Sequence, residues 1–295
     1  MPIATRAFAA TAADKPLTPY SFERRDPGPD DVAIQIKYAG VCHSDLHIVK
    51  NDLGNTTYPI VPGHEIAGVV SAVGEGVTKY QVGDRVGVGC PVNSCGECEQ
   101  CRNHQEQACL NGNVGTYNST DVDGTITQGG YSQKVVVNEN FVCRIPDSLD
   151  FDVAAPLLCA GITTYSPLAN WNVHEGQNVA VLGLGGLGHM GVQIAVAMGA
   201  NVTVLSRTTS KEAYAKELGA SRLLATSEPD FFTNHRGEFD FILNTISAPI
   251  DLRGYLGLLK PFGAMVLVGL PPEGLEISAR NLIVGDKALA GSNIG

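Results

Sequence analysis

Residues 179–188, VAVLGLGGLG, determine how the second half of this 295-residue chain folds. The first four are apolar and favour a buried strand, and a GxGxxG pattern follows at once. Residues 187–198 are predicted to be helical, and residues 201–205 are predicted to form a second strand. A GxGxxG turn between a strand and a helix, inside a βαβ unit, is typical of dinucleotide binding.

The residues of this turn are the first candidates for cofactor contacts. Gly183 allows the tight turn, Gly185 lets the backbone approach a pyrophosphate, and Gly188 lets the helix pack on the strand. The helix N-terminus would then hold the pyrophosphate. The expected contacts at this turn are Gly183, Gly185, Gly186, Leu187 and Gly188.

The end of the second predicted strand lacks the usual acidic residue. An acid there would accept a hydrogen bond from a ribose 2′-hydroxyl and repel a 2′-phosphate. The sequence instead offers hydroxyl donors and positive charge, at Ser206, Arg207, Ser210 and Lys211. This favours NADP(H), with a solvated loop before a helix at 211–218 as the alternative.

The first half of the chain has a different pattern. Apolar residues alternate along 31–38, which predicts a strand with one buried face. Further strands are expected at 66–73, 82–86 and 135–137, separated by Gly-rich turns. These features predict an all-β, barrel-like domain.

Two domains are therefore expected, at residues 1–158 and 159–295. Buried strands predicted at 239–245 and 263–269 would extend the βαβ unit into a doubly wound sheet. The fold class is thus an α/β domain preceded by a β domain.

Residues 41–47, VCHSDLH, combine four chemical groups in one short stretch. Cys42 offers a thiolate ligand for zinc, and Ser44 offers a hydroxyl that can pass a proton. Asp45 could hold a metal-bound imidazole in place, and His47 can exchange a proton with solvent. The alternative is a strand end with a buried cysteine and surface histidines, leading into a loop.

Four cysteines follow with the spacing CxxCxxCx7C, at Cys95, Cys98, Cys101 and Cys109. Thiolates this close in sequence can close a tetrahedron around one structural zinc, with no open position. The other two cysteines outside the candidate sites, Cys90 and Cys143, are expected to be ordinary buried residues of strands.

Composition excludes several classes of function. The formal net charge of −10 argues against general binding to nucleic acid or membrane surfaces. The N-terminus shows no signal peptide. Residues 179–205 contain no charged side chain, but six glycines and a turn argue against a membrane span. A cytoplasmic protein with metal-binding rather than disulfide-bonded cysteines is expected.

Taken together, these segments resemble the zinc-dependent medium-chain alcohol dehydrogenases, in particular the cinnamyl alcohol dehydrogenase-like branch of NADPH-dependent aldehyde reductases. Six segments, which occur in the family's order, carry the resemblance. They are GVCHSDLH at 40–47, GHE at 63–65, VGDRV at 82–86, the four-cysteine segment at 95–109 (the cysteine lobe), CAGITTYSPL at 159–168 and GLGGLG at 183–188. It implies a GroES-like catalytic domain followed by a Rossmann domain.

The resemblance also implies two Zn²⁺ ions per chain, one catalytic and one structural. Cys42, His64 and Cys159 match the catalytic zinc ligands, and Glu65 matches a carboxylate that can approach the metal. Cys159 lies at the expected start of a helix, where the dipole favours a thiolate.

The same comparison implies roles for four further residues. Ser44 and His47 match a proton relay, and Asp45 matches the carboxylate behind the zinc-bound histidine. Thr163 matches a contact on the nicotinamide side of the cofactor. The implied activity is hydride transfer between NADP(H) and an aldehyde or primary alcohol, favouring aldehyde reduction.

Two alternatives stay open: a zinc polyol or secondary-alcohol dehydrogenase, and a catalytically silent, zinc-stabilised nucleotide-binding protein. The expected partners are a small aldehyde or alcohol and, as a candidate assembly, a second copy in a homodimer.

Two features depart from the family pattern. Residues 112–116, GNVGT, replace a bulky aromatic found in many plant relatives. The chain stops at Gly295, where family members usually return to the catalytic domain, so a shortened form of a longer enzyme is expected.

Overall fold

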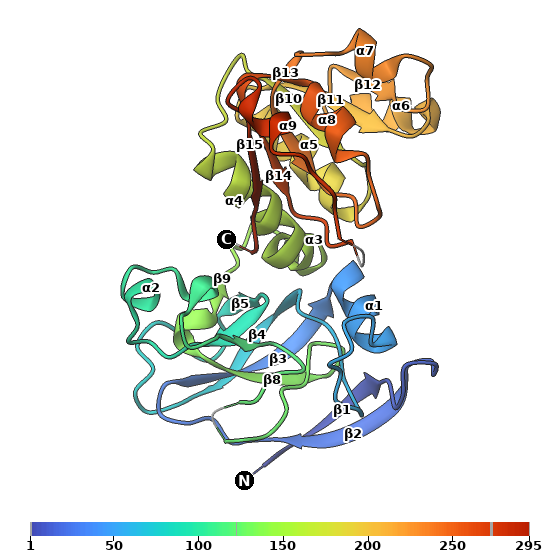
Figure 1. Cartoon of the computed structure of the whole chain (residues 1–295). Coiled ribbons are helices and arrows are strands. Elements are labelled where there is room, and N and C mark those ends of the chain that lie inside the picture. Colours follow the sequence, from blue (N-terminus) through green and yellow to red (C-terminus); the bar gives the residue numbers. More distant parts are fainter. Residues whose placement is uncertain (1, 122, 272–273, 295) are drawn as a thin grey trace. The chain divides into compact units, whose positions relative to one another are not determined.

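The chain divides into two compact units, Met1–Cys159 and Ala160–Gly295 (Figure 1). The computed structural model describes residues 2–121, 123–271 and 274–294, so the chain end at Gly295 lies outside the described residues. The division falls one residue later than expected, which leaves Cys159 with the first unit.

The first unit is built from antiparallel strands. A five-stranded sheet has the order β8-β3-β4-β5-β9, and two-stranded sheets pair β1 with β2 and β6 with β7. The strands are β1 Ile3–Ala9, β2 Thr18–Arg24, β3 Asp31–Ala39, β4 Ile66–Val73, β5 Arg85–Val88, β6 Pro91–Asn93, β7 Val114–Gly115, β8 Lys134–Asn138 and β9 Cys143–Arg144. The helices are α1 His43–Lys50, α2 Glu99–Arg102 and α3 Phe151–Pro156.

Alternating side chains of these strands form the core of the first unit. Val32 and Ile34 on β3 are fully buried, as are Ile66 on β4 and Val86 and Val88 on β5. Because side chains alternate along a strand, this spacing places them on one face of the sheet. The strand predicted at 31–38 is present, but the predicted alternation holds only in part, because Ala33 on the other face is also buried and Tyr38 is 51% exposed.

Arg24, at the end of β2, attaches this strand to the segment that leads into β8. Its guanidinium donates to the carbonyl oxygens of Lys134 (2.7 Å), Gln128 (2.7 Å) and Gly129 (3.0 Å). It also donates to the Ser132 hydroxyl at 3.0 Å. The planar fork of arginine matches such a set of acceptors, which fixes the backbone of residues 128–134.

The second unit contains a six-stranded parallel sheet with the order β12-β11-β10-β13-β14-β15. This is the doubly wound arrangement expected from the sequence. The strands are β10 Asn178–Leu182, β11 Asn201–Ser206, β12 Arg222–Ala225, β13 Phe239–Asn244, β14 Leu259–Leu267 and β15 Ala288–Gly291. The helices are α4 Ile162–Asn170, α5 Gly186–Ala197, α6 Glu212–Glu217, α7 Phe231–Asn234, α8 Leu252–Gly257 and α9 Arg280–Ile283.

Both faces of this sheet are covered by helices, so the central residues of its strands are buried on both faces. On β10, Val179 and Val181 face one core, which contains side chains of α4, α5 and α6. Ala180 and Leu182 face the other core, which contains side chains of α7 and α8. The uncharged stretch 179–205 forms β10, α5 and most of β11, and within the described residues no helix is long and apolar enough to cross a bilayer.

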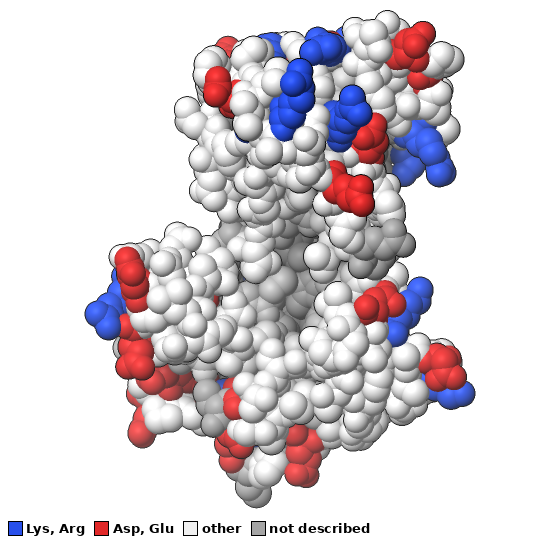
Figure 2. All heavy atoms as spheres, in the orientation of Figure 1, with Lys and Arg blue, Asp and Glu red and all other residues white. Residues whose placement is uncertain are grey.

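Charge is distributed unevenly between the units. The acidic excess of the chain lies mainly in the first unit. On the face shown in Figure 2, lysine and arginine side chains are interspersed with acidic ones over the second unit, in the upper part of the view. A cofactor with several phosphates would therefore meet less repulsion at the second unit.

Candidate active site

The stretch 41–47 begins a helix and does not form the loop expected after β3. Cys42 has extended backbone angles and caps α1, and its N–H donates to the Asp45 carboxylate at 2.9 Å. An acidic side chain at the third helical position commonly satisfies an N-cap amide in this way. The capping interaction brings Cys42 and Asp45 together and buries Asp45 to 2% exposure.

Cys42, His64, Glu65 and Cys159 form one cluster, in which the ligand atoms all lie within 4.8 Å of one another. The sulfur atoms of Cys42 and Cys159 are 3.9 Å apart. A zinc tetrahedron with Zn–S bonds of about 2.3 Å has an S–S edge of about 3.8 Å. Nε2 of His64 is buried and has no hydrogen-bond partner among the described residues. Two thiols, an orphaned imidazole nitrogen and a carboxylate fit Zn²⁺.

The pKa values of Cys42 and Glu65 also bear on metal binding by this cluster. Hydrogen bonding to Cys159, together with burial, raises the pKa of the Cys42 thiol to about 12. Burial, followed by the charge of Cys42, raises the pKa of Glu65 to about 7. A cation would favour the thiolate form of Cys42 at neutral pH, where Glu65 is already partly ionised.

Asp45 supports His64 from the side opposite the cluster. His64 Nδ1 lies 3.1 Å from Asp45 Oδ1. Burial by itself would raise the pKa of Asp45, but hydrogen bonds from His64 and from two backbone amides outweigh it and lower the pKa. An ionised carboxylate only accepts, so Nδ1 carries a proton. Burial opposes a charged imidazole, but hydrogen bonding to Asp45 and to the two thiols outweighs it and raises the pKa of His64, so a metal would displace the proton on Nε2.

The backbone around Cys159 differs from the expectation. Cys159 does not begin a helix: it lies in a π-helical segment, Leu157–Gly161, between α3 and α4. A helix N-terminus therefore does not account for a thiolate here. One wider turn inside a helix is a common feature of functional sites, and this one carries the buried thiol into the cluster.

Ser44 and His47 lie on the same helix as the Cys42 cap. The Ser44 hydroxyl is 3.7 Å from the Cys42 sulfur. His47 Nδ1 lies 2.8 Å from the Asp52 carboxylate, whereas its buried Nε2 has no partner in the part of the chain that the structure describes. Asp52 was not foreseen from the sequence. Its position just past the end of α1 was the one available signal.

The four cysteines of the lobe also converge. Their sulfur–sulfur distances include 3.5 Å for Cys98–Cys101, 3.5 Å for Cys95–Cys109 and 3.9 Å for Cys95–Cys101. These distances suit the edges of a tetrahedron around one zinc ion. The four ligand atoms lie within 4.8 Å of one another, so the set can be closed by thiolates alone.

The expectation for the remaining cysteines was wrong. Cys143 is exposed on β9, an edge strand, and Cys90 is only partly buried. Cys90 lies just before β6, and the influence of Cys159 and His64 lowers the pKa of its thiol to about 6. Apolar neighbours in sequence did not predict burial, because an edge strand leaves one side open to solvent.

The glycine-rich turn of the second unit has the local geometry of a phosphate loop. Gly183 has φ +93°, in the left-handed region, and Gly185 precedes the first turn of α5. A Cβ added at Gly185 or Gly186 would meet nothing within 4 Å among the described residues, so a ligand could approach this backbone. The unpaired N–H groups of the α5 N-terminus suit a pyrophosphate.

The segment after β11 lies against this turn. Lys211 donates to the carbonyl oxygen of Leu184 at 2.9 Å, and Thr208 and Ser210 are joined by a hydrogen bond of 2.9 Å. Arg207 is exposed and Ser206 is half-buried. Lys211 therefore reaches the loop, and Ser206, Arg207 and Ser210 lie in the same segment at and after the end of β11. Thr163 is buried in α4 of the same unit.

Family models match both units. Residues 28–147 match the alcohol dehydrogenase GroES-like domain, and residues 186–295 match the zinc-binding dehydrogenase domain. Among solved structures, a cinnamyl alcohol dehydrogenase from Sorghum bicolor superposes with a TM-score of 0.96 at 45% identity, over 99% of this chain and 84% of that chain. One from Helicobacter pylori, complexed with NADP(H), gives a TM-score of 0.94 at 43% identity, over 100% and 85%.

Curated relatives agree with the structures. NADP-dependent alcohol dehydrogenase C 1 of Mycolicibacterium smegmatis is 58% identical over 98% of this chain and 83% of its own length. A probable cinnamyl alcohol dehydrogenase of Oryza sativa is 51% identical over 98% and 79%. The chain belongs to the zinc-dependent medium-chain alcohol dehydrogenases, in the branch that resembles cinnamyl alcohol dehydrogenase.

Proposed function

We propose that this chain is a zinc-dependent oxidoreductase that transfers hydride between NADP(H) and an aldehyde or primary alcohol, favouring aldehyde reduction. The observation that carries the proposal is the cluster of Cys42, His64 and Cys159, in which the buried Nε2 of His64 has no hydrogen-bond partner among the described residues. It is supported by relatives that are named as NADP-dependent alcohol dehydrogenases and cinnamyl alcohol dehydrogenases.

In this proposal the first unit holds zinc and prepares it for an oxygen ligand. Cys42, His64 and Cys159 would bind Zn²⁺, which supplies Lewis acidity toward a carbonyl or alcohol oxygen. Asp45 keeps the His64 proton on Nδ1, so that Nε2 remains a ligand. Glu65 lies within the cluster and offers a carboxylate that can approach or leave the metal.

A second group of residues would move the proton that accompanies hydride transfer. Ser44 would pass a proton between a substrate oxygen and His47. His47 exchanges it with solvent, and Asp52 holds Nδ1 of His47 at 2.8 Å. Asp52 therefore fixes the orientation of the imidazole and leaves Nε2 for the exchange.

The second unit would bind NADP(H), whose nicotinamide supplies the hydride chemistry. Gly183, Gly185, Gly186, Leu187 and Gly188 would receive the pyrophosphate, and Thr163 would contact the nicotinamide side. Ser206, Arg207, Ser210 and Lys211 would receive the 2′-phosphate. No acidic side chain stands at the end of β11, so a 2′-phosphate would meet donors without repulsion.

The proposal includes a homodimer and a cytoplasmic location. β15 lies at one edge of the parallel sheet, and edge strands can pair with the same strand of a second copy, which supports a homodimer. Thiol-rich metal sites need reduced cysteines, which supports a cytoplasmic location.

The proposal is tested with zinc-replete protein and a panel of aromatic and aliphatic aldehydes, by following NADPH oxidation. The parent chain and a Cys143→Ser control should consume NADPH, because Cys143 is an exposed thiol on β9. Cys42→Ser should lose activity while keeping its fold, because it removes one catalytic ligand. Activity in Cys42→Ser equal to that of the control would refute the proposed site.

A further inference from the structure

The carboxylate of Asp45 is buried and accepts four hydrogen bonds. Its Oδ1 receives the N–H of Gly63 at 2.9 Å and faces His64 Nδ1 at 3.1 Å. Its Oδ2 receives the N–H of Cys42 at 2.9 Å and the hydroxyl of Tyr131 at 3.0 Å. Two of the donors are backbone amides, so Tyr131 is a donor that a side-chain substitution can remove without touching a zinc ligand.

Tyr131 is itself held in place by backbone contacts. Its N–H donates to the carbonyl oxygen of Pro62 at 2.9 Å, and its own carbonyl oxygen accepts from Phe8 at 2.9 Å. Next to it, Gly130 donates to the carbonyl oxygen of Gly63 at 2.7 Å. These backbone hydrogen bonds fix the position of the Tyr131 main chain independently of α1, and from that position the hydroxyl donates to the Asp45 carboxylate.

The chain also leaves room for this ring beside the metal ligand. Gly63 has φ +103°, and a Cβ at this position would lie 2.6 Å from Cδ1 of Tyr131. Only glycine combines that backbone conformation with so close a ring. Gly63 directly precedes His64, so the Tyr131 ring packs against the turn that carries the His64 imidazole.

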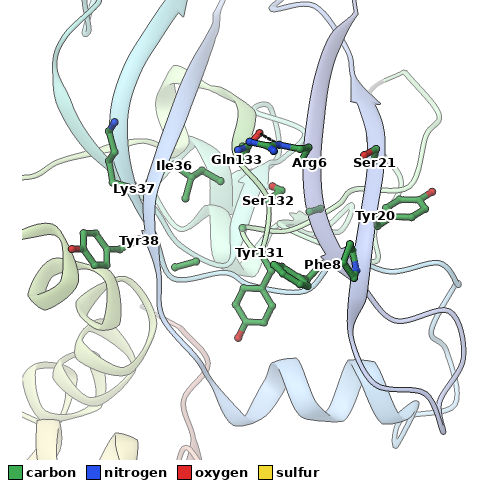
Figure 3. A pocket seen from close by; sticks show the side chains of 14 residues that line it. Arg6, Phe8, Tyr20, Ser21, Ile36, Lys37, Tyr38, Tyr131, Ser132 and Gln133 are labelled. Atoms are coloured by element: carbon green, nitrogen blue, oxygen red, sulfur yellow. Dashed lines mark hydrogen bonds between the residues drawn. The ribbon is translucent and has the colours of Figure 1, made fainter.

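Tyr131 also lines an open pocket of about 580 Å³ in the first unit. Figure 3 shows its ring in this pocket beside Phe8, with the phenol directed towards α1. Tyr20 and Tyr38 line other parts of the same pocket. One residue thus borders the open pocket with its ring and contacts the buried carboxylate with its hydroxyl.

We propose that Tyr131 is a positioning residue of the metal centre: its hydroxyl fixes the Asp45 carboxylate, and Asp45 fixes the imidazole of His64. The inference rests on the proposed function, because it assigns Tyr131 an effect on zinc held by His64. Loss of an outer-shell partner commonly lowers metal affinity or activity about 10- to 100-fold. The hydroxyl of Tyr117, 3.0 Å from His64 Nδ1, acts on the imidazole directly, whereas Tyr131 acts through Asp45.

The first test compares Tyr131→Phe with Tyr20→Phe, which removes a hydroxyl from the same pocket without changing the metal centre. Zinc-loaded proteins are titrated with a chromophoric chelator, and the amount and affinity of each zinc are measured. Tyr131→Phe should keep the zinc of the cysteine lobe and bind the second zinc about tenfold more weakly or worse. Tyr20→Phe should match the parent.

A double-mutant cycle with Asp45→Asn distinguishes positioning from a general structural effect. If Tyr131 acts through Asp45, adding Tyr131→Phe to Asp45→Asn should change zinc affinity by less than about twofold. The inference is overturned if the two effects add fully, or if Tyr131→Phe binds zinc as tightly as the parent while the parent holds two ions. A parent that holds no second zinc overturns the proposed function, and this inference with it.

Discussion

Replacing Gly188 by alanine tests how α5 packs on the glycine-rich turn. A Cβ at Gly188 would lie 2.2 Å from the carbonyl oxygen of Gly183 and 2.9 Å from its carbonyl carbon. Both are backbone atoms, so no side chain can rotate away and the helix itself must move. Overpacking of this kind costs about 1–3 kcal/mol, and alanine's better helix propensity returns up to about 1 kcal/mol. Because both clashing atoms are backbone, the upper end of the cost applies, and about 3 less about 1 leaves a net loss of about 2 kcal/mol in the free energy of unfolding.

The loss should be measurable both as stability and as cofactor binding. Thermal unfolding should show a Tm several degrees lower, and titration calorimetry should show NADPH affinity reduced about tenfold, because the N–H donors at the start of α5 shift with the helix. The matched control is Gly257→Ala at the end of α8, where an added Cβ meets no described atom within 4 Å. That change should be neutral or stabilising by up to about 1 kcal/mol. If Gly188→Ala is as stable as Gly257→Ala and binds NADPH like the parent, the packing argument fails.

Three further outcomes follow from the proposed sites. Cys98→Ser should lower Tm and remove one of two zinc ions, whereas Cys42→Ser should remove the other ion with a smaller loss of Tm. Both expectations would be contradicted if elemental analysis of the metal-replete parent found fewer than two zinc ions. Arg207→Asp should weaken NADPH about tenfold or more and NADH much less, since repulsion replaces attraction at one phosphate; equal NADPH and NADH kinetics in the parent would count against this. His47→Ala should retain zinc, slow turnover about 10²-fold or more and change the pH profile of turnover. Asp52→Asn should also slow turnover, but by a smaller factor. Loss of zinc in His47→Ala would show that His47 has another role.

The elements with strong periodicity were predictable from the sequence. The apolar run at 66–73 coincides with β4, and the glycine turn does separate β10 from α5. In both cases the signal is local, because side-chain alternation and glycine positions report directly on the backbone. The fold class of both units could therefore be predicted before the structure was known.

The metal centre could not be assembled from local signals. Cys42 and Cys159 are 117 residues apart, and nothing in either segment specifies that their sulfur atoms meet. The start of α1 had a local signal, the Asp45 side chain that accepts from the N–H of Cys42, whereas nothing local indicated the π-helical turn at Leu157–Gly161, where a helix start was expected. Family resemblance indicated the ligands, whereas Tyr131 and Asp52 became visible only in three dimensions.

Arg24 has a consequence for how variants of this protein would be interpreted. Its guanidinium holds the backbone of 128–134, and that segment carries Tyr131 to Asp45. A screen that records only lost turnover would therefore place Arg24 among the residues of the reaction centre, although its own bonds go to the backbone and to Ser132. Measuring protein abundance and zinc content alongside turnover would separate a residue that maintains the scaffold from one that takes part in the chemistry.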